Sequence, residues 1–255
     1  DGTFEVTAPT YRKDVDCAAD LIEEIARAYG LNKIPPAQTG RSYFNQSTFG
    51  ESLVDAENAI AGVLCGRGFS EAINYSITGE HWNSFGSHFD GPSDVAVRLL
   101  NAQSAQRDAM RMTLAPALIE NVAANLRYQS GVHLFEFGRT YFRTPQGIQE
   151  EDMLAWCSAG SLRPPFWGDQ SVGTAHGLEY NLHDLKGILI AVLGRMGIHS
   201  VRFGSLQSES MTAGQAFSVH VGEKQIGFIG EVDPDTASKY GVEDYLNIKY
   251  ACVGG

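Results

Sequence analysis

Basic residues are scarce in this sequence of 255 residues. It holds 19 Lys and Arg against 30 Asp and Glu, which gives a formal net charge of −11 at pH 7. A protein whose main task is to bind nucleic acid needs clustered cations to neutralise phosphates, and here the cations are scattered. The composition therefore argues against a major nucleic-acid-binding surface within this chain.

Cysteine pairs and long apolar runs are also lacking. The four cysteines, Cys17, Cys65, Cys157 and Cys252, form no C-x-x-C motif, so we expect reduced, mostly buried thiols rather than a zinc site or a disulfide framework. No stretch reaches the roughly 18 apolar residues of a membrane span, and no signal peptide is visible. We interpret the chain, which opens at Asp1 without a Met, as an excised piece of a longer, cytoplasmic protein.

The hydrophobic patterns predict helices and strands in an irregular order. Helical spacing predicts helices over residues 17–29, 53–65, 114–129 and 183–197. Alternation predicts strands over residues 3–8, 95–100, 132–142, 153–161 and 246–253, and a hairpin over 215–232. Residues 67–77 are predicted to be a turn leading into a strand. Because the β-α-β rhythm of a parallel sheet is missing, we expect an α+β fold, an antiparallel β-sheet flanked by helices. The polar stretch 37–50 is predicted to be a linker between residues 1–36 and a main domain over 51–253.

Negative charge is concentrated in one short stretch. Residues 11–30 hold five carboxylates, Asp14, Asp16, Asp20, Glu23 and Glu24. At about 100° per residue, three of these acids share one side of the predicted helix, and the opposite side is apolar and suited to burial, with Leu21, Ile22, Ile25 and Tyr29.

Two interpretations of this acidic face stay open on spacing alone. It can be a solvated surface, with Asp16 capping the helix and Asp20 favoured by the helix dipole. It can also be a site for a hard cation, because crowded carboxylates repel one another and Mg²⁺ relieves that repulsion while accepting oxygen ligands. Neither His nor Cys joins the acidic face, which disfavours zinc and redox metals.

The same stretch and its flanks resemble the phenylalanine–tRNA synthetase beta subunit family. "PTYRKDVDCAADLIEEIARAYGLNKIP" follows the family pattern P-x-x-R-x-D-(x5)-D-L-I-E-E-I-A-R-x-Y-G-(x3)-I-P. Later blocks follow in family order: "GFSEAINYSI", "MRMTLAPALIENVAANLRY" for L-R-x-S-L-L-P, "HLFEFGRTYF" for L-F-E-x-G-x-x-F, "HDLKG" for D-x-K-G and "IGFIGEVDP" for I-G-x-x-G-E-x-H-P. The sequence departs from the patterns at Met110, where Leu is usual, and at Val232-Asp233 in the last block.

The resemblance implies a fold, partners and a metal site. It implies a catalytically silent, class II synthetase-like core over 51–253, preceded by the tail of a small α/β domain, the C-terminal part of the family's B5 domain, over 1–36. It implies an alpha subunit that binds ATP and phenylalanine in an (αβ)2 complex acting on tRNA(Phe). It further implies a Mg²⁺ ion shared with the alpha subunit and held by four acids of the beta motif, Asp14, Asp20, Glu23 and Glu24. The editing pocket and the anticodon-contacting domain lie outside the matching blocks.

No complete catalytic site is visible. Arg139 stands on the predicted strand where a class II enzyme holds ATP, but it lacks the Arg-x-Glu setting, and a function needs a whole site. We therefore expect no catalytic residue, and no activity from the chain alone. Aromatic residues on predicted loops are candidate anchors for the alpha subunit: Trp82, Phe85, Phe166 and Trp167.

A stand-alone magnesium-dependent enzyme using the same four acids is the alternative. Such an enzyme would need a neighbouring cation or base for phosphate or acid–base chemistry. Arg12, Lys13 and Arg27 are near in sequence, although Arg12 and Arg27 can equally serve as charge partners of the acids. An RNA-binding module, a third alternative, is disfavoured by the negative net charge.

Overall fold

The computed structural model describes residues 2–36, 53–85, 95–102, 104, 106–162, 179–242 and 248–254. The chain divides into two compact units, Asp1–Phe49 and Gly50–Gly255, and each is described by itself. The predicted linker, residues 37–50, lies outside the described residues. None of the helices within these ranges has the length and hydropathy needed to cross a membrane.

The first unit contains α1, Ala18–Tyr29, and the short 3-10 helix η1, Leu31–Lys33. The prediction of a helix over 17–29 is confirmed. Gly30 ends it in the left-handed region, with φ of 102°, and its N–H donates to the carbonyl of Ala26 at 2.9 Å. The prediction of a strand over 3–8 is wrong: these residues form no regular element, because a strand is stable only when a neighbouring strand pairs with it.

The apolar side of α1 is not buried in the described structure. No α1 residue is buried, and the side chains of Ile22 and Ile25 are 67% and 68% exposed. The expectation that this side packs into a core is therefore wrong for the described chain. Residues 2–7, which precede the helix, are exposed as well, so they provide no surface to cover it.

The second unit is built on an eight-stranded sheet with the strand order β1-β5-β6-β10-β9-β8-β7, and with β3 also paired to β5. Its strands are β1 Ser70–Glu71, β3 Val95–Ala96, β5 Gly131–Thr144, β6 Gly147–Gly160, β7 Arg202–Ser205, β8 Met211–Val221, β9 Lys224–Val232 and β10 Lys249–Gly254. Two short strands, β2 Ile77–Thr78 and β4 Ala109–Met110, pair separately.

The sheet is mixed, which corrects the expectation of a purely antiparallel one. β1 runs parallel to β5, and every other pairing in the sheet of the described chain is antiparallel. The chain between β1 and β5 includes a helix, and parallel neighbours require such a crossover. The hairpin predicted over 215–232 is confirmed, because β8 pairs with β9. The strands predicted over 132–142 and 153–161 are confirmed as β5 and β6, which also pair with each other along their whole length in a hairpin that was not predicted.

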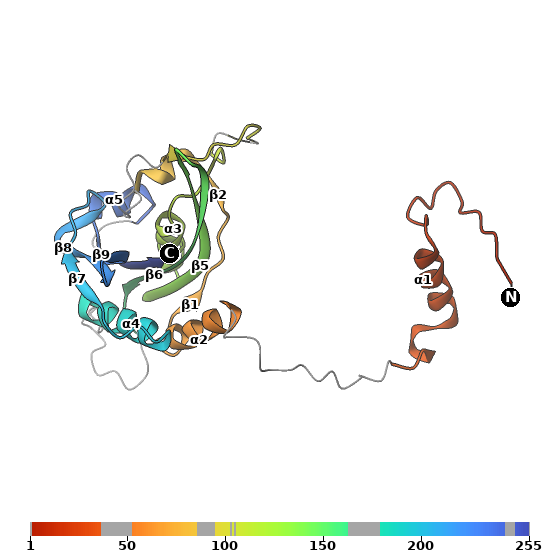
Figure 1. The fold of residues 1–255 in the computed structure, drawn as a ribbon, viewed down its shortest axis with the longest axis horizontal. Coiled ribbons are helices and arrows are strands. Elements are labelled where there is room, and N and C mark those ends of the chain that lie inside the picture. The colour runs from red at the N-terminus through yellow and green to blue at the C-terminus, as the bar shows by residue number, and fades with distance from the viewer. Residues whose placement is uncertain are drawn as a thin grey trace. The chain divides into compact units, whose positions relative to one another are not determined.

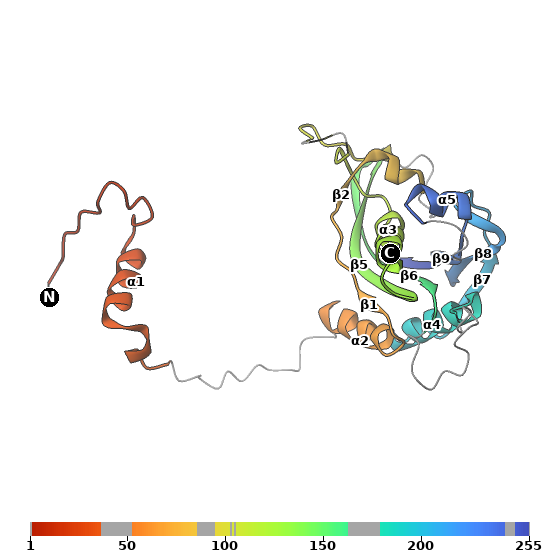
Figure 2. The same cartoon turned by 180° about the vertical axis from the view of Figure 1, so that it is seen from behind.

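Helices cover both faces of the sheet (Figures 1 and 2). α3, Ala115–Leu126, packs against β5 and β6 on one face, while α2, Leu53–Cys65, and α4, Leu182–Arg195, pack against each other on the opposite face. All three were predicted. The short elements η2, Glu80–Phe85, and α5, Pro234–Lys239, were not.

Two cores result from this layering. Side chains of α3 pack with one face of the strands, around Leu118 and Tyr250. Side chains of α2 and α4 pack with the other face, around Leu64, Leu189 and Trp156. Successive side chains of β5 point to opposite faces of the sheet. Val132 therefore lies in the core under α3, and Phe135, three residues later, lies in the core under α2 and α4.

The cysteines are free, but only half of them are buried. Cys157 and Cys252 are buried in the sheet, whereas Cys17 and Cys65 are exposed. The expectation of mostly buried thiols is therefore wrong for Cys17 and Cys65. Cys17 directly precedes α1, and Cys65 is the last residue of α2. Burial raises the pKa of both sheet thiols, so they stay protonated and unreactive at neutral pH.

Candidate functional site

Arg12 joins two of the four predicted metal ligands. Its Nη2 lies 2.7 Å from Oδ2 of Asp14 and 2.6 Å from Oε1 of Glu24. Its Nε donates to both oxygens of Asp14, at 3.0 and 3.1 Å. These hydrogen bonds lower the pKa of both carboxyl groups and raise the pKa of Arg12, with the Asp14 bond as the largest cause. Asp14 lies ahead of α1 and Glu24 lies in it, so the guanidinium ties the incoming chain to the helix.

Asp20 serves the helix N-terminus. Its Oδ2 accepts the backbone N–H of Asp16 at 3.0 Å and that of Cys17 at 2.9 Å. Cys17 is the N-cap residue and Asp20 is the third residue of the helix, so this is the returning half of a capping box. The predicted cap, Asp16, is therefore one residue too early. The bonds to Cys17 and Asp16 lower the pKa of Asp20.

Glu23 makes a third, separate contact, an ion pair with Arg27 one turn later. Of the four predicted ligands, only Asp14 and Glu24 thus share a partner. Within the described ranges, three side chains lie close enough together to bind one metal ion: Asp16, Cys17 and Asp20. Their potential ligand atoms lie within 4.8 Å of one another. That group includes a thiol, which suits softer metals than magnesium, and its closeness follows from the capping bonds.

The chemistry of the four predicted ligands nevertheless fits Mg²⁺. All four offer carboxylate oxygens, the donors that a hard cation prefers, and Mg²⁺ commonly binds one or two carboxylates and keeps several waters. The exposed fraction of Asp14 is 65% and that of Glu24 is 37%, so a hydrated ion can reach both. Arg12 and Arg27 already act as charge partners, which confirms that interpretation of the two arginines.

A buried ion pair lies in the second unit, on the α3 face of the sheet. Arg111 Nη1 lies 2.6 Å from Oε1 of Glu136, and their side chains are 5% and 2% exposed. Glu136 also accepts the backbone N–H of Asn74 at 3.2 Å and its side-chain amide at 2.8 Å. Asn121 of α3 in turn donates to Asn74 Oδ1 at 2.8 Å. The network therefore ties the chain after β1, strand β5 and helix α3 to one another.

Gly138 makes room for this pair. A Cβ built on Gly138 would lie 2.2 Å from Nη2 of Arg111, and the guanidinium is held in place by the carbonyl of Arg139, which accepts from Arg111 Nε at 2.9 Å. A larger residue would displace the arginine. The close approach, rather than backbone freedom, accounts for the glycine.

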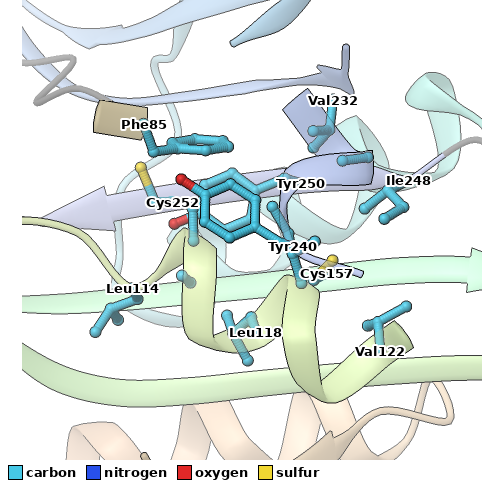
Figure 3. Close-up of a cluster of buried hydrophobic side chains, with 14 of the residues drawn as sticks. Phe85, Leu114, Leu118, Val122, Cys157, Val232, Tyr240, Ile248, Tyr250 and Cys252 are labelled. Atoms are coloured by element: carbon cyan, nitrogen blue, oxygen red, sulfur yellow. The ribbon is translucent and has the colours of Figure 1, made fainter. Parts of the chain in front are cut away.

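Apolar and aromatic side chains fill the rest of the α3 face (Figure 3). Tyr250 of β10 lies between the rings of Phe85 and Phe228, with centroids 5.9 and 5.5 Å away. Leu114 and Leu118 close the layer from the α3 side. Phe85 is only 1% exposed, so the expectation that it anchors a partner is wrong: it is a core residue. Trp82 is half-buried, and Phe166 and Trp167 lie outside the described residues.

Arg139 faces the other way and is engaged at the surface. Its Nε donates to Asp152, the directly opposite residue on β6, at 3.0 Å, and its Nη1 lies 3.3 Å from Glu150. Its side chain is 58% exposed. The hypothesis that it is a surface residue of a strand therefore agrees with its position.

An apolar groove of about 820 Å³ lies on the face that α2 and α4 share. Leu53 of α2, Phe137 of β5 and Met196 after α4 are among its lining residues, with Arg139 and Asp152 also at its wall. Ile73 lines it too and is 92% exposed. Tyr75, which does not line the groove, is 73% exposed. The guanidinium carbon of Arg107 lies over its ring, 4.7 Å from the ring centroid.

Two family models match the chain. The model of the phenylalanyl tRNA synthetase beta chain CLM domain matches residues 47–248, and the tRNA synthetase B5 domain matches residues 1–31. The chain belongs to the phenylalanyl-tRNA synthetase beta chain family. The resemblance drawn from the sequence motifs is thereby confirmed.

Relatives in this beta chain family are moderately similar over nearly the whole chain. Phenylalanine–tRNA ligase beta subunits of Protochlamydia amoebophila and Lactiplantibacillus plantarum are 30% and 31% identical over 245 and 251 residues, 96% and 95% of this chain. That of Desulfotalea psychrophila is 32% identical over 253 residues, 93% of this chain. The chain spans about 30% of the length of these relatives.

Solved structures extend the comparison to the fold. A crystal structure of pyrrolysyl-tRNA synthetase from Desulfitobacterium hafniense, 18% identical, superposes with a TM-score of 0.60 over 98% of this chain and 80% of its own. Another structure from this organism, of the pyrrolysyl-tRNA synthetase PylSc, gives a TM-score of 0.58 at 19% identity over 80% and 64%. The helix-flanked mixed sheet of this beta chain is therefore a tRNA-synthetase fold.

The buried ion pair between Arg111 and Glu136 was not predicted from the sequence, although both residues belong to motifs of the family. Arg111 is the Arg of the L-R block, and Glu136 and Gly138 are the Glu and Gly of L-F-E-x-G. The motif letters were the available signal, but they lie 25 residues apart in the chain. Only the fold shows that they contact each other.

Proposed function

We propose that this chain forms the non-catalytic core of the beta subunit of a phenylalanine–tRNA ligase. In this proposal it holds the alpha subunit in an (αβ)2 complex in the cytoplasm, and the alpha subunit binds ATP and attaches phenylalanine to tRNA(Phe). Membership of the beta chain family supports the assignment to that enzyme.

The proposal that this chain is non-catalytic rests on one observation: side chains fill the α3 face of the sheet. A nucleotide site needs a concave, hydrated surface with cations placed for phosphates. Here the aromatic layer around Tyr250 occupies that face, and its cation, Arg111, is buried on Glu136. Arg139, on β5, is paired with two carboxylates, Glu150 and Asp152.

The alpha subunit, we propose, docks on the exposed apolar edge formed by Leu53, Val54, Ile73 and Tyr75. These side chains are 62%, 62%, 92% and 73% exposed. Leu53 and Ile73 line the same groove, and a large exposed apolar patch marks an interaction site. Asn74, between Ile73 and Tyr75, points inward to Glu136, so the buried network fixes the segment that displays the two outer side chains.

The metal proposal concerns Asp14, Asp20, Glu23 and Glu24. Together with the alpha subunit they would hold Mg²⁺, whose positive charge offsets the repulsion among these carboxylates. The alternative of a stand-alone magnesium enzyme gains no support from the geometry. Two of its three candidate cations, Arg12 and Arg27, are paired with the acids themselves, which leaves Lys13 as the third.

Co-elution with the alpha subunit tests the docking proposal. We expect the 255-residue chain to co-elute with purified alpha subunit in size-exclusion chromatography, and Ile73→Asp to weaken that association at least tenfold, since it places a charge within an apolar contact. Ile148→Asp is the matched control, because Ile148 is another exposed isoleucine, at 53%, but lies on β6 near the β5–β6 turn. Equal weakening by the two variants would contradict the proposed edge.

A further inference from the structure

Arg12 stands where a metal ion bound by Asp14 and Glu24 would stand. Its Nη2 lies within 2.7 Å of an oxygen of each carboxylate. We infer that Arg12 is an exchangeable counter-ion, which keeps these two acids together while no metal is bound and leaves them when a divalent cation binds. This inference rests on the magnesium site proposed above and deepens it.

The two carboxylates need a cation to stay together. Asp14 precedes α1, and Glu24 lies in its second turn, so no helix geometry holds them side by side. An oxygen of each carboxylate contacts the same nitrogen of Arg12, and two negative charges this close to each other repel. Arg12 forms four hydrogen bonds to the pair, which offsets the repulsion and prepares both side chains to bind one positive centre.

Exchange, rather than coexistence, follows from distances and charge. Mg²⁺ binds oxygen at about 2.0–2.1 Å, so an ion bound to the two oxygens that contact Nη2 would lie against the guanidinium. Like charges this close repel strongly. The single charge of Arg12 leaves the pair net negative, whereas a divalent ion neutralises both acids. The Arg12 side chain is 34% exposed, so it can turn into solvent.

The other two proposed ligands allow this exchange without unfolding the helix end. Both capping bonds of Asp20 end on Oδ2, so a metal bound through Oδ1 would leave these two backbone hydrogen bonds intact. Glu23 is held only by an exposed pair with Arg27, whose side chains are 61% and 59% exposed. Such surface pairs are weak, so the cost of redirecting Glu23 is small.

Metal titration of charge-matched variants tests the exchange. Arg12→Gln and Lys13→Gln remove the same charge from adjacent residues, and only Arg12 is paired with the proposed ligands. Mn²⁺ binding is followed by electron paramagnetic resonance, and Mg²⁺ binding by calorimetry, on the chain alone and on its complex with the alpha subunit. We expect Arg12→Gln to bind both ions about three- to tenfold more tightly than Lys13→Gln, since it removes a competitor of exposed ion-pair strength.

Two results would overturn the inference in distinguishable ways. Equal or weaker binding by Arg12→Gln means that Arg12 supports the bound ion, and the exchange is wrong although the metal site stands. No binding by any variant, with or without the alpha subunit, removes the magnesium site and the exchange together. As a second readout, the ¹⁵N–¹H signal of Arg12 Nε in the wild-type chain should shift to that of a free guanidinium at saturating Mg²⁺. A bound ion with an unshifted signal would contradict the exchange.

Discussion

At the residue scale, the ion pairs of this chain divide into exposed and buried ones. Arg139 with Glu150 is a solvent-exposed pair across the β5–β6 hairpin, and Arg111 with Glu136 is enclosed under α3. Exposed pairs contribute little to stability. A buried pair contributes little net free energy when intact, but losing one partner leaves an uncompensated charge in a medium of low dielectric constant.

Glu136→Gln is therefore expected to destabilise the second unit strongly. It leaves Arg111 buried without a counter-charge, at a cost of about 3–5 kcal/mol in the free energy of unfolding. Urea unfolding followed by tryptophan fluorescence gives the measurement, because all three tryptophans lie in the second unit and Trp156 of β6 is fully buried. Glu150→Gln on the same hairpin is the control, with an expected loss below about 1 kcal/mol. A loss for Glu136→Gln no larger than the control would show that the network is not structural.

His133 carries a predicted pH dependence. Its Nε2 lies 3.0 Å from the carbonyl of Ser161 and its Nδ1 lies 2.8 Å from Ser158 Oγ, so Nε2–H donates and Nδ1 accepts. Burial lowers the pKa of His133, while in the unfolded chain it stays near about 6.5. The unfolded state thus binds the proton more readily, and stability is lost as the pH falls through the unfolded value toward the folded one.

The melting temperature should accordingly fall between about pH 7.5 and pH 5.5, and His133→Gln should make that fall smaller. The variant loses hydrogen bonds and melts lower at both pH values, so the diagnostic quantity is the change with pH. His183→Gln, at an exposed position on α4, should keep the wild-type change. An unaltered pH dependence in His133→Gln would assign the acid sensitivity to other groups.

The sequence predicts residue identities at the candidate metal site but not their contacts. The family motif indicated Asp14, Asp20, Glu23 and Glu24 as ligands, which stays a prediction. The structure adds that Arg12 bridges the first and last of them and that Asp20 closes the helix. Capping and bridging depend on side-chain rotamers and on the path of residues 12–17, which a spacing argument does not specify.

At the scale of elements, length decided which features the sequence could predict. The helices α1, α2, α3 and α4, the strands β5 and β6 and the β8–β9 hairpin have long periodic patterns, and all were predicted. The pairing of β5 with β6 was not. The strand predicted within residues 67–77 is present only as the two-residue β1 and the start of β2, with no strand at 72–76. The two-residue β4 and the six-residue α5 are too short to show a period. The direction in which β1 pairs with β5 depends on contacts between distant segments of the chain. The local hydrophobic pattern therefore could not predict that the sheet is mixed.

Leu118→Ala tests the packing of α3 on the sheet. Leu118 is fully buried in the core around Tyr250, and truncating such a side chain costs about 2–5 kcal/mol in the free energy of unfolding because it leaves a cavity. Urea unfolding followed by tryptophan fluorescence, which reports on the second unit, measures the loss. Ile22→Ala, on the exposed side of α1 in the other unit, should leave this transition within about 0.5 kcal/mol of wild type. A Leu118→Ala chain as stable as wild type would show that α3 does not close this face.

At the scale of the whole molecule, the two units carry different tasks in the proposed function. The first, Asp1–Phe49, presents the acidic helix, and the second, Gly50–Gly255, presents the filled sheet and the apolar edge. Family membership follows from motifs spread along the chain, so it could be predicted before the structure. The filled α3 face could not, because the rings of Phe85, Phe228 and Tyr250 come from three distant segments.

The central claim is that this chain supports catalysis by another subunit and performs none itself. Phenylalanine-dependent exchange of pyrophosphate into ATP, measured on the 255-residue chain alone, on the alpha subunit alone, and on the alpha subunit with this chain or with a full-length beta chain, tests it most directly. The account predicts no exchange above buffer from the 255-residue chain alone and exchange only where the alpha subunit is present. Phenylalanine-dependent exchange by this chain without the alpha subunit would contradict the account.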